Sequence, residues 1–180
     1  MKKKLLFLAL ILSINFSHAQ VFNTGETLSH KAFSIGVEPV VLMNGSNDFM
    51  LFLHGGYGIK KGVDLCITGG LLGTNSYFGA NLEFSMGRHI SLAFGAHDFG
   101  NFGIDGTLNT SIGITRGVKL YAGLDSDLNF PKNGDTQLLV WLPIGVDIAL
   151  RKNVSFLFES EIGLTDPAYN LIGGGLMFYF

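Results

Sequence analysis

The sequence closes with "GGGLMFYF" at residues 173–180, so its last residue is aromatic. Counting back from the end in steps of two gives Phe180, Phe178, Leu176, Gly174 and Ile172. The alternate positions are smaller and more polar as a set, and a period of two residues is that of a β-strand with one apolar face. A chain end in water usually frays and gains nothing from a phenylalanine. The stretch therefore predicts a final strand whose apolar face is covered by something other than water.

The same alternation recurs upstream in nine further segments, each about 9–12 residues long and bounded by turn residues. In the first of them, "AFSIGVEPVVL" at 32–42, Phe33, Ile35 and Val41 face away from Ser34 and Glu38. Segments of this length match a tilted strand that crosses a bilayer. An even number of them places both chain ends on one side of the membrane. We predict an all-β, transmembrane, antiparallel up-and-down β-barrel of ten strands, with eight strands and two weak hairpins as the alternative.

Charged residues follow one face of these segments. They share the face of the glycines, serines, threonines and asparagines, and comprise Glu38, Asp64, Glu83, Asp105, Lys119, Asp125, Asp127, Asp147, Glu159 and Glu161. Only 14% of the chain is charged and 47% is hydrophobic, whereas soluble domains average about 25% charged residues. Beyond the first twenty residues no uninterrupted apolar run approaches the roughly 18 residues of a membrane-spanning helix. The composition therefore favours strands over helices as the membrane-spanning elements.

Alternation alone leaves open which face lines the interior. A soluble lipocalin-like barrel would put the apolar face inside, but its outer face would then be mostly glycine and small polar residues with a single lysine, Lys119. Aromatic residues also gather at the segment ends, as in an interfacial girdle: Phe49, Tyr77, Phe78, Phe99, Phe102, Phe130 and Tyr169. We therefore expect the polar face in the lumen and the apolar face against lipid.

The first residues, "MKKKLLFLALILSINFSHAQ", combine three lysines, a short apolar run and small residues near Ala19. This pattern predicts a signal peptide at 1–19, cleaved after Ala19 or Gln20, because the run is too short for a membrane anchor. Residues 20–30 would be an N-terminal periplasmic segment and residues 31–180 the barrel. The chain has a single cysteine, Cys66, so it forms no internal disulfide. Because Cys66 lies far from the predicted cleavage site, the sequence does not predict a lipoprotein.

The connections between segments are of two kinds. Four are tight and basic, at Lys60-Lys61, Arg88, Arg116 and Arg151-Lys152, and the others are longer and richer in Asn, Asp and aromatic residues. Short turns on the periplasmic side and longer loops outside are the expected asymmetry of such barrels. We expect inward acids near the basic turns to form ion pairs, for example Asp64 with Lys60.

Taken together, the signal peptide, the alternating strands, the tight turns and the final phenylalanine resemble the small outer-membrane β-barrels of Gram-negative bacteria, the OmpA/OmpX-like class. The resemblance covers the predicted mature chain. It implies an outer-membrane location, contact with outer-membrane lipid, and a C-terminal signal read by the barrel-assembly machinery. That signal would comprise Ile172, Leu176, Phe178 and Phe180.

Function is less constrained than fold, and the first class we consider is a structural or interaction barrel with a filled lumen. Barrels of eight strands leave room only for side chains or one small ligand, whereas sixteen leave a water channel. Ten strands lie near the filled end of this range. The side chains expected to fill the lumen are Phe52, His54, Tyr121, Trp141 and Leu157.

The alternative is a narrow cation-preferring pore. The inward face is acidic, and the carboxylates expected in its outer half have no basic partners in the strands: Glu38, Asp105, Asp125, Asp127, Glu159 and Glu161. Such a cluster attracts cations. We interpret it as a hydrated acidic vestibule, with a divalent-metal site as the sharper alternative, and we predict no resident metal.

An enzyme, either a lipid-modifying hydrolase or a barrel protease, is the least favoured class. His97 is expected inward near the outer end, with Asp105, Asp125 and Asp127 as candidate carboxylate partners, but no serine is clearly placed beside it as a nucleophile. We therefore predict no enzymatic activity, no catalytic residues and no cofactor. The chain carries no basic stripe for nucleic acid, and the sequence leaves its oligomeric state open.

Overall fold

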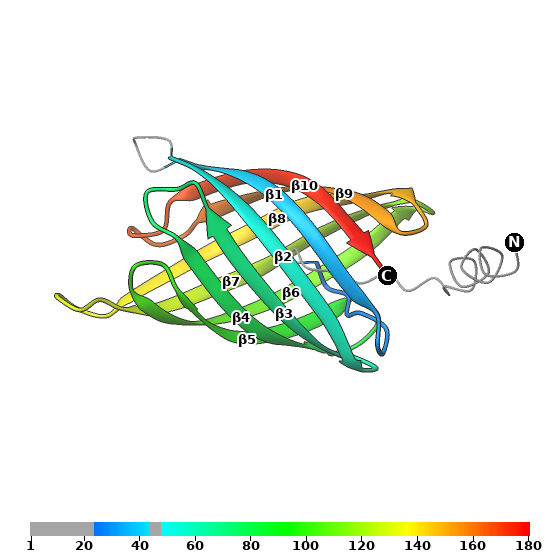
Figure 1. Cartoon of the computed structure of the whole chain (residues 1–180), viewed down its shortest axis with the longest axis horizontal. Helices are drawn as coiled ribbons and strands as arrows, with labels where there is room; N and C mark the ends of the chain where they lie inside the picture. Colours follow the sequence, from blue (N-terminus) through cyan, green and yellow to red (C-terminus); the bar gives the residue numbers. More distant parts are fainter. Residues whose placement is uncertain (1–23, 44–47) are drawn as a thin grey trace, which may run out of the picture.

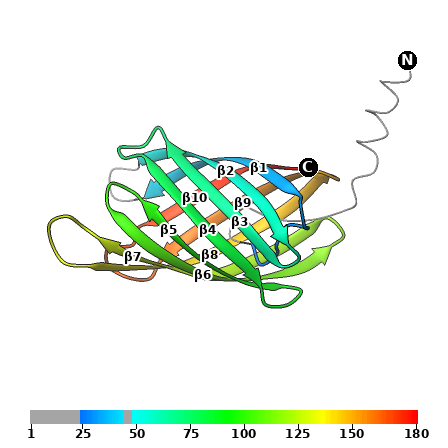
Figure 2. The same cartoon turned by 60° about the horizontal axis from the view of Figure 1, so that its bottom comes forward.

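Ten antiparallel strands close into a barrel in the computed structural model, which describes residues 24–43 and 48–180. The strands are β1 (Phe33–Met43), β2 (Asp48–Lys60), β3 (Val63–Leu71), β4 (Tyr77–Ser85), β5 (Ile90–Asp98), β6 (Phe102–Thr115), β7 (Val118–Phe130), β8 (Gln137–Arg151), β9 (Val154–Gly163) and β10 (Asn170–Tyr179). Each strand pairs with its neighbours in sequence, and β1 pairs with β10 (Figures 1 and 2). The predicted fold class and its strand number are confirmed. The predicted signal peptide, 1–19, lies outside the described residues.

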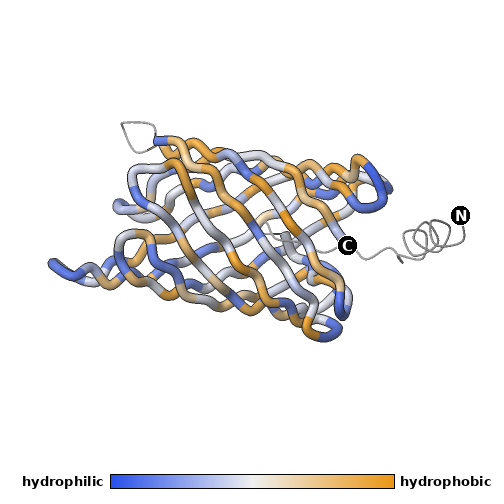
Figure 3. Tube along the Cα trace, in the orientation of Figure 1, coloured by the Kyte–Doolittle hydropathy of each residue, from blue (hydrophilic) through white to orange (hydrophobic). Residues whose placement is uncertain are grey.

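The two faces of the strands differ as predicted. Large apolar side chains point outward on every strand; Ile35, for example, is 54% exposed and Phe94 56%. Inward positions are buried and include Glu38, Asp64, Glu83, Asp147 and Glu159. Figure 3 shows the resulting alternation of hydrophobic and hydrophilic residues along the strands. A closed barrel with an apolar exterior satisfies its backbone hydrogen bonds internally and can lie in hydrocarbon. No helix in the described ranges is long and apolar enough to span a membrane.

The two ends of the barrel are built differently (Figure 1). One end, here called the inner end, carries the C-terminus and the short turns after β2, β4, β6 and β8. Three of these turns follow a register irregularity, at Gly58/Lys60, Gly113/Thr115 and Ala149/Arg151. The other end, the outer end, carries the longer connections, among them the 131–136 loop between β7 and β8. The predicted alternation of short turns and longer loops is present with one exception, since the β5–β6 connection at 99–101 is shorter than the β4–β5 turn at 86–89.

The last residue of the chain closes the barrel seam. Phe180 and Phe33 exchange two backbone hydrogen bonds, of 2.9 and 3.1 Å, just beyond the β1–β10 ladder. Their rings stack with centroids 4.8 Å apart. Ile172, Leu176 and Phe178 point outward on the same strand, since the intervening Gly173, Gly175 and Met177 are buried. The apolar face of "GGGLMFYF" therefore belongs to the outer surface of the barrel, at the seam.

Residues 24–32, the inner segment, lie at the inner end of the barrel, with residues 24–28 inside it and residues 29–31 exposed. The N–H of Leu28 donates a hydrogen bond to Asp64, so Asp64 is held by this segment, and the predicted pair with Lys60 is wrong. Lys119, the inward lysine, pairs with Glu26. Residues 20–30 were expected as an N-terminal periplasmic segment; of these, residues 24–28 lie in the lumen at the inner end of the barrel.

A glycine on β2 makes room for the inner segment. Lys31 N–H donates to Gly58 O at 2.8 Å, and Gly58 N–H donates to Ala32 O at 2.9 Å. A Cβ at position 58 would lie 2.0 Å from the backbone oxygen of Ser29. Only glycine permits such a close backbone approach.

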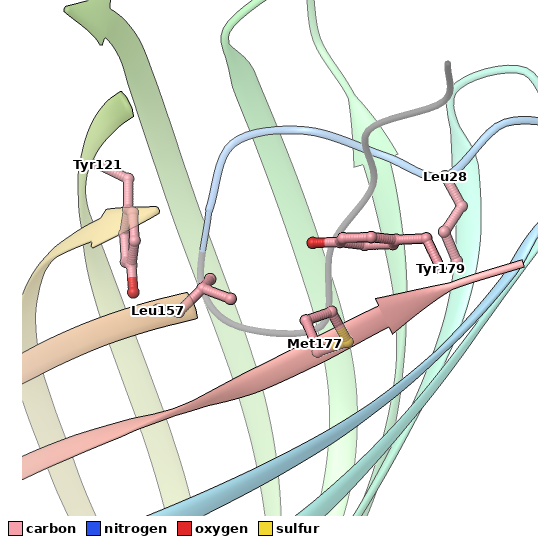
Figure 4. Close-up of a cluster of buried hydrophobic side chains, with 5 residues drawn as sticks. All are labelled: Leu28, Tyr121, Leu157, Met177 and Tyr179. Atoms are coloured by element: carbon pink, nitrogen blue, oxygen red, sulfur yellow. The ribbon is translucent and has the colours of Figure 1, made fainter. Parts of the chain in front are cut away.

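An apolar cluster fills the lumen beside this segment. Leu28 packs with Tyr121, Leu157, Met177 and Tyr179, all of them buried (Figure 4). The cluster joins the inner segment to β7, β9 and β10. Two of the predicted lumen-filling residues, Tyr121 and Leu157, belong to it. The inner half of the lumen is therefore packed with side chains rather than open.

Candidate functional site: an acidic cavity in the outer half of the lumen

A cavity of about 210 Å³ occupies the lumen beyond the apolar cluster, toward the outer end. Its acidic lining comprises all six carboxylates that the sequence placed in an outer vestibule: Glu38, Asp105, Asp125, Asp127, Glu159 and Glu161. Two histidines, His54 and His97, line it as well, and no lysine or arginine among the described residues does. The cavity thus collects acids from four strands, β1, β6, β7 and β9, around two imidazoles.

The first imidazole, His54 on β2, contacts Glu38 on the neighbouring strand. Its Nε2 lies 2.9 Å from Glu38 Oε2, and both side chains are 8% exposed. The β1–β2 register sets Glu38 opposite Phe52, so His54 reaches it diagonally, two residues further along its strand. Diagonal neighbours on one face of a sheet are within reach of long side chains. The Thr68 hydroxyl lies 3.4 Å from the other ring nitrogen.

The second imidazole, His97 at the end of β5, lies between two aspartates. Its Nδ1 is 3.1 Å from Asp105 Oδ2, and its Nε2 is 3.6 Å from Asp127 Oδ2. The same Nε2 is 2.9 Å from Asn129 Oδ1. The His97 side chain is only 2% exposed, whereas those of Asp105 and Asp127 are 14% and 18% exposed. The ring is buried, and its acidic partners face the cavity.

Aromatic rings and one glycine hold this imidazole in place. Tyr77 stacks on His97 with ring centroids 5.6 Å apart, and Phe99 packs against Tyr77 at 6.0 Å. A Cβ at Gly103 would lie 2.5 Å from His97 Nε2 and 2.3 Å from Asn129 Oδ1. The ring and the amide therefore occupy space that exists because position 103 has no side chain.

The remaining acids complete the lining. The Thr107 hydroxyl donates a hydrogen bond of 2.6 Å to Asp125 Oδ1. Glu159 is 6% exposed, and its Oε2 has no hydrogen-bond partner among the described residues. At the outer rim, burial raises the pKa of Tyr169 to about 12, with nearby carboxylates adding to the effect. Tyr169 therefore stays protonated at neutral pH and adds no charge to the cavity.

The sequence located the acids correctly but missed their partners. The expectation that they lack basic partners in the strands is wrong, because His54 and His97 face three of them. Asn129 and Tyr77 were not assigned to the site, although both occupy inward positions near strand ends. His54, Phe52 and Trp141 line the cavity that they were expected to fill.

Comparison with solved structures finds barrels of the same general architecture. One is the outer-membrane protein Ail of Yersinia pestis in a phospholipid nanodisc, 11% identical, covering 84% of this chain and 100% of that one, with a TM-score of 0.46. Another is a de novo designed transmembrane β-barrel, 12% identical, with coverages of 84% and 98% and a TM-score of 0.44. A third is Neisserial surface protein A, 11% identical, with coverages of 83% and 96% and a TM-score of 0.42. No family model and no curated protein sequence matches the chain.

The membrane assignment rests on the barrel itself. The barrel is closed, and its strands are antiparallel and even in number. Its exterior is apolar and its interior is polar. These are the features of barrels in bacterial outer membranes. The resemblance to small outer-membrane barrels therefore holds at the level of architecture: the chain is an integral outer-membrane β-barrel protein.

Proposed function

We propose that this protein is a closed barrel with a structural or interaction role, which presents an acidic cavity at its outer end and conducts no solute. The observation that carries the proposal is the inner segment, residues 24–32, which lies across the inner end of the lumen. It is hydrogen-bonded to β2 and β3 and ion-paired to β7. Beside it, the cluster of Leu28, Tyr121, Leu157, Met177 and Tyr179 packs in the inner half of the lumen.

The outer surface supports a role as a membrane-anchored scaffold. The apolar belt would contact outer-membrane lipid over its whole circumference, whereas the longer loops and the cavity would face outward. We further propose that Ile172, Leu176, Phe178 and Phe180 form the signal read by the barrel-assembly machinery. Their outward orientation at the seam makes them available before the barrel closes.

Conductance separates the closed barrel from the cation pore. The mature protein, refolded and inserted in planar bilayers at about 0.1 M salt, where the field of a charge still extends over a Debye length of roughly 10 Å, should show no steady current. Protease resistance of the same preparation establishes that the silent protein is inserted. Steady cation-selective currents that lose their selectivity when Asp125, Asp127 and Glu161 are changed together to Asn, Asn and Gln would replace this proposal with the pore.

A further inference from the structure

Two aspartates face each other directly across the β6–β7 ladder. Asp105 and Asp127 are register partners, and both point into the cavity. Like charges directly opposite each other on one face of a sheet are destabilising, and the penalty grows in a barrel interior, where the effective dielectric is low. A cation between the two carboxylates would remove this repulsion. The side chain that lies between them is His97.

His97, Asp105 and Asp127 each supply one ligand atom to a group whose members lie within 4.8 Å of one another. Bound to one zinc ion with bonds of about 2.0–2.1 Å in tetrahedral geometry, such atoms would be about 3.3 Å apart. Asp105 Oδ2 lies 3.1 Å from His97 Nδ1, close to this value, whereas Asp127 Oδ2 lies 3.6 Å from the other ring nitrogen, Nε2. An ion at Nδ1 therefore requires Asp127, the ladder partner of Asp105, to turn toward that side of the ring.

The surroundings of His97 suit a metal ligand in two respects. Both of its ring nitrogens face an oxygen, so Nδ1, beside Asp105, can bind a metal while Nε2 keeps its hydrogen bond to Asn129. Such a hydrogen bond fixes the tautomer and the orientation of metal-binding histidines. Stacking against Tyr77 and the missing side chain at Gly103 hold the ring further.

The wider cavity favours an additional positive charge. Glu159, elsewhere in the lining, is buried and leaves one carboxylate oxygen without a hydrogen bond. Even if both histidines were protonated, the six carboxylates would exceed the cationic groups that line the cavity. The partial exposure of Asp105 and Asp127 gives an ion access from the cavity.

From this geometry we propose that His97, Asp105 and Asp127 form a binding site for one divalent first-row transition metal of the Zn²⁺ type, open to the outer cavity. Imidazole is a ligand suited to zinc, copper, iron and nickel, whereas magnesium and calcium take oxygen ligands. Three protein ligands leave a fourth position for water or for a group brought by a partner. The site goes beyond the proposed closed barrel, because a closed lumen needs no metal.

Calorimetric titration of Zn²⁺ into the full mature protein, refolded in detergent and stripped with a chelator, tests the site. We expect one ion per barrel. His97→Gln and Asp127→Asn should each weaken binding at least about tenfold, since loss even of a residue that supports a metal ligand typically costs 10–100-fold. The matched control is His54→Gln, which removes the histidine that faces a single carboxylate in the same cavity. It should leave the affinity within about twofold of the wild type.

A second measurement needs no variant. Co²⁺ added to the stripped wild-type protein should give the visible absorption bands of a four-coordinate site, and Zn²⁺ should abolish them. Absence of these bands, or absence of Zn²⁺ binding, overturns the proposal. Zn²⁺ binding that survives both substitutions in folded protein also overturns the proposal. An equal loss of affinity in His54→Gln does so as well, because the ion would then be held by the general charge of the cavity.

Discussion

Ile144 lies at the middle of β8 and points away from the lumen, with 46% of its surface exposed. We predict that Ile144→Arg lowers the free energy of unfolding by roughly 2–4 kcal/mol, because arginine at the bilayer midplane loses its hydration. Leu138→Arg is the matched control, on the same face of the same strand but near its outer end. It should cost about 0–1 kcal/mol. Urea unfolding in lipid vesicles measures both, and equal costs would argue against a membrane-embedded belt.

For a single residue, the sequence predicts which face of the strand its side chain occupies, but not which side chains it contacts. Alternation alone placed Glu38 and Asp105 in the lumen. Their pairing with His54 and His97 depends on the offset between neighbouring strands. That offset is set by hairpin geometry and closure of the barrel, and the apolar pattern of a single strand does not encode it.

Among the elements, β10 is followed directly by Phe180, the residue that seals the seam. Phe180→Ala keeps the backbone bonds to Phe33 but removes the ring stack, which is worth about 0.5–1.5 kcal/mol beyond buried area. We expect refolding in detergent to be nearly normal and the level in the outer membrane of cells to fall several-fold. Phe130→Ala removes a comparable stack, with Phe102, at the other end of the barrel. Equal levels of the two variants in cells would show that the terminus is no assembly signal.

The inner segment depends on Gly58, so its docking can be broken by one substitution. In Gly58→Val the new side chain would collide with the Ser29 backbone and release hydrogen bonds worth about 1 kcal/mol each. Amide exchange in residues 24–32 should become at least about tenfold faster, because 1.4 kcal/mol corresponds to a factor of ten. Gly55→Val on the same strand is the control, since only Ile67 O lies near its added Cβ, at 3.9 Å. Unchanged exchange in Gly58→Val would mean that the segment is held by other contacts.

No local sequence pattern predicts the inner segment. Residues 24–32 lack the alternation of a strand, and their order comes from contacts with distant residues such as Asp64 and Lys119. The glycine at 58 is visible in the sequence, but nothing in the sequence shows what approaches it. Elements held by tertiary contacts alone are those that pattern analysis misses.

For the whole molecule, the arrangement of its two ends predicts a labelling pattern. Asn133 lies in the β7–β8 loop at the outer end, and Lys61 lies in the β2–β3 turn at the inner end; both are exposed. In intact cells a membrane-impermeant maleimide should label Asn133→Cys and spare Lys61→Cys until the outer membrane is permeabilised. The native Cys66 is buried and should contribute little background. The opposite labelling pattern would show that the barrel is inserted in the opposite orientation, with its inner end facing outward.

Barrel closure and strand number were predictable because they follow from counting alternating segments. The even count and the apolar last strand require β1 and β10 to meet, as they do. The size of the cavity was not predictable, because it depends on how far the inner segment and the apolar cluster extend into the lumen. Side chains were expected to fill the lumen, with a hydrated acidic vestibule in its outer half, and the cavity lies in that half.

Trp141 gives the molecule a built-in optical reporter. It is the only tryptophan in the chain, it lines the cavity, and its ring nitrogen donates a hydrogen bond of 2.8 Å to Tyr169 O at the outer rim. Its emission therefore originates at one known depth and responds to wetting of the cavity mouth. Circular dichroism, in contrast, follows all ten strands. If the two signals separate in a denaturation experiment, the mouth opens before the barrel does.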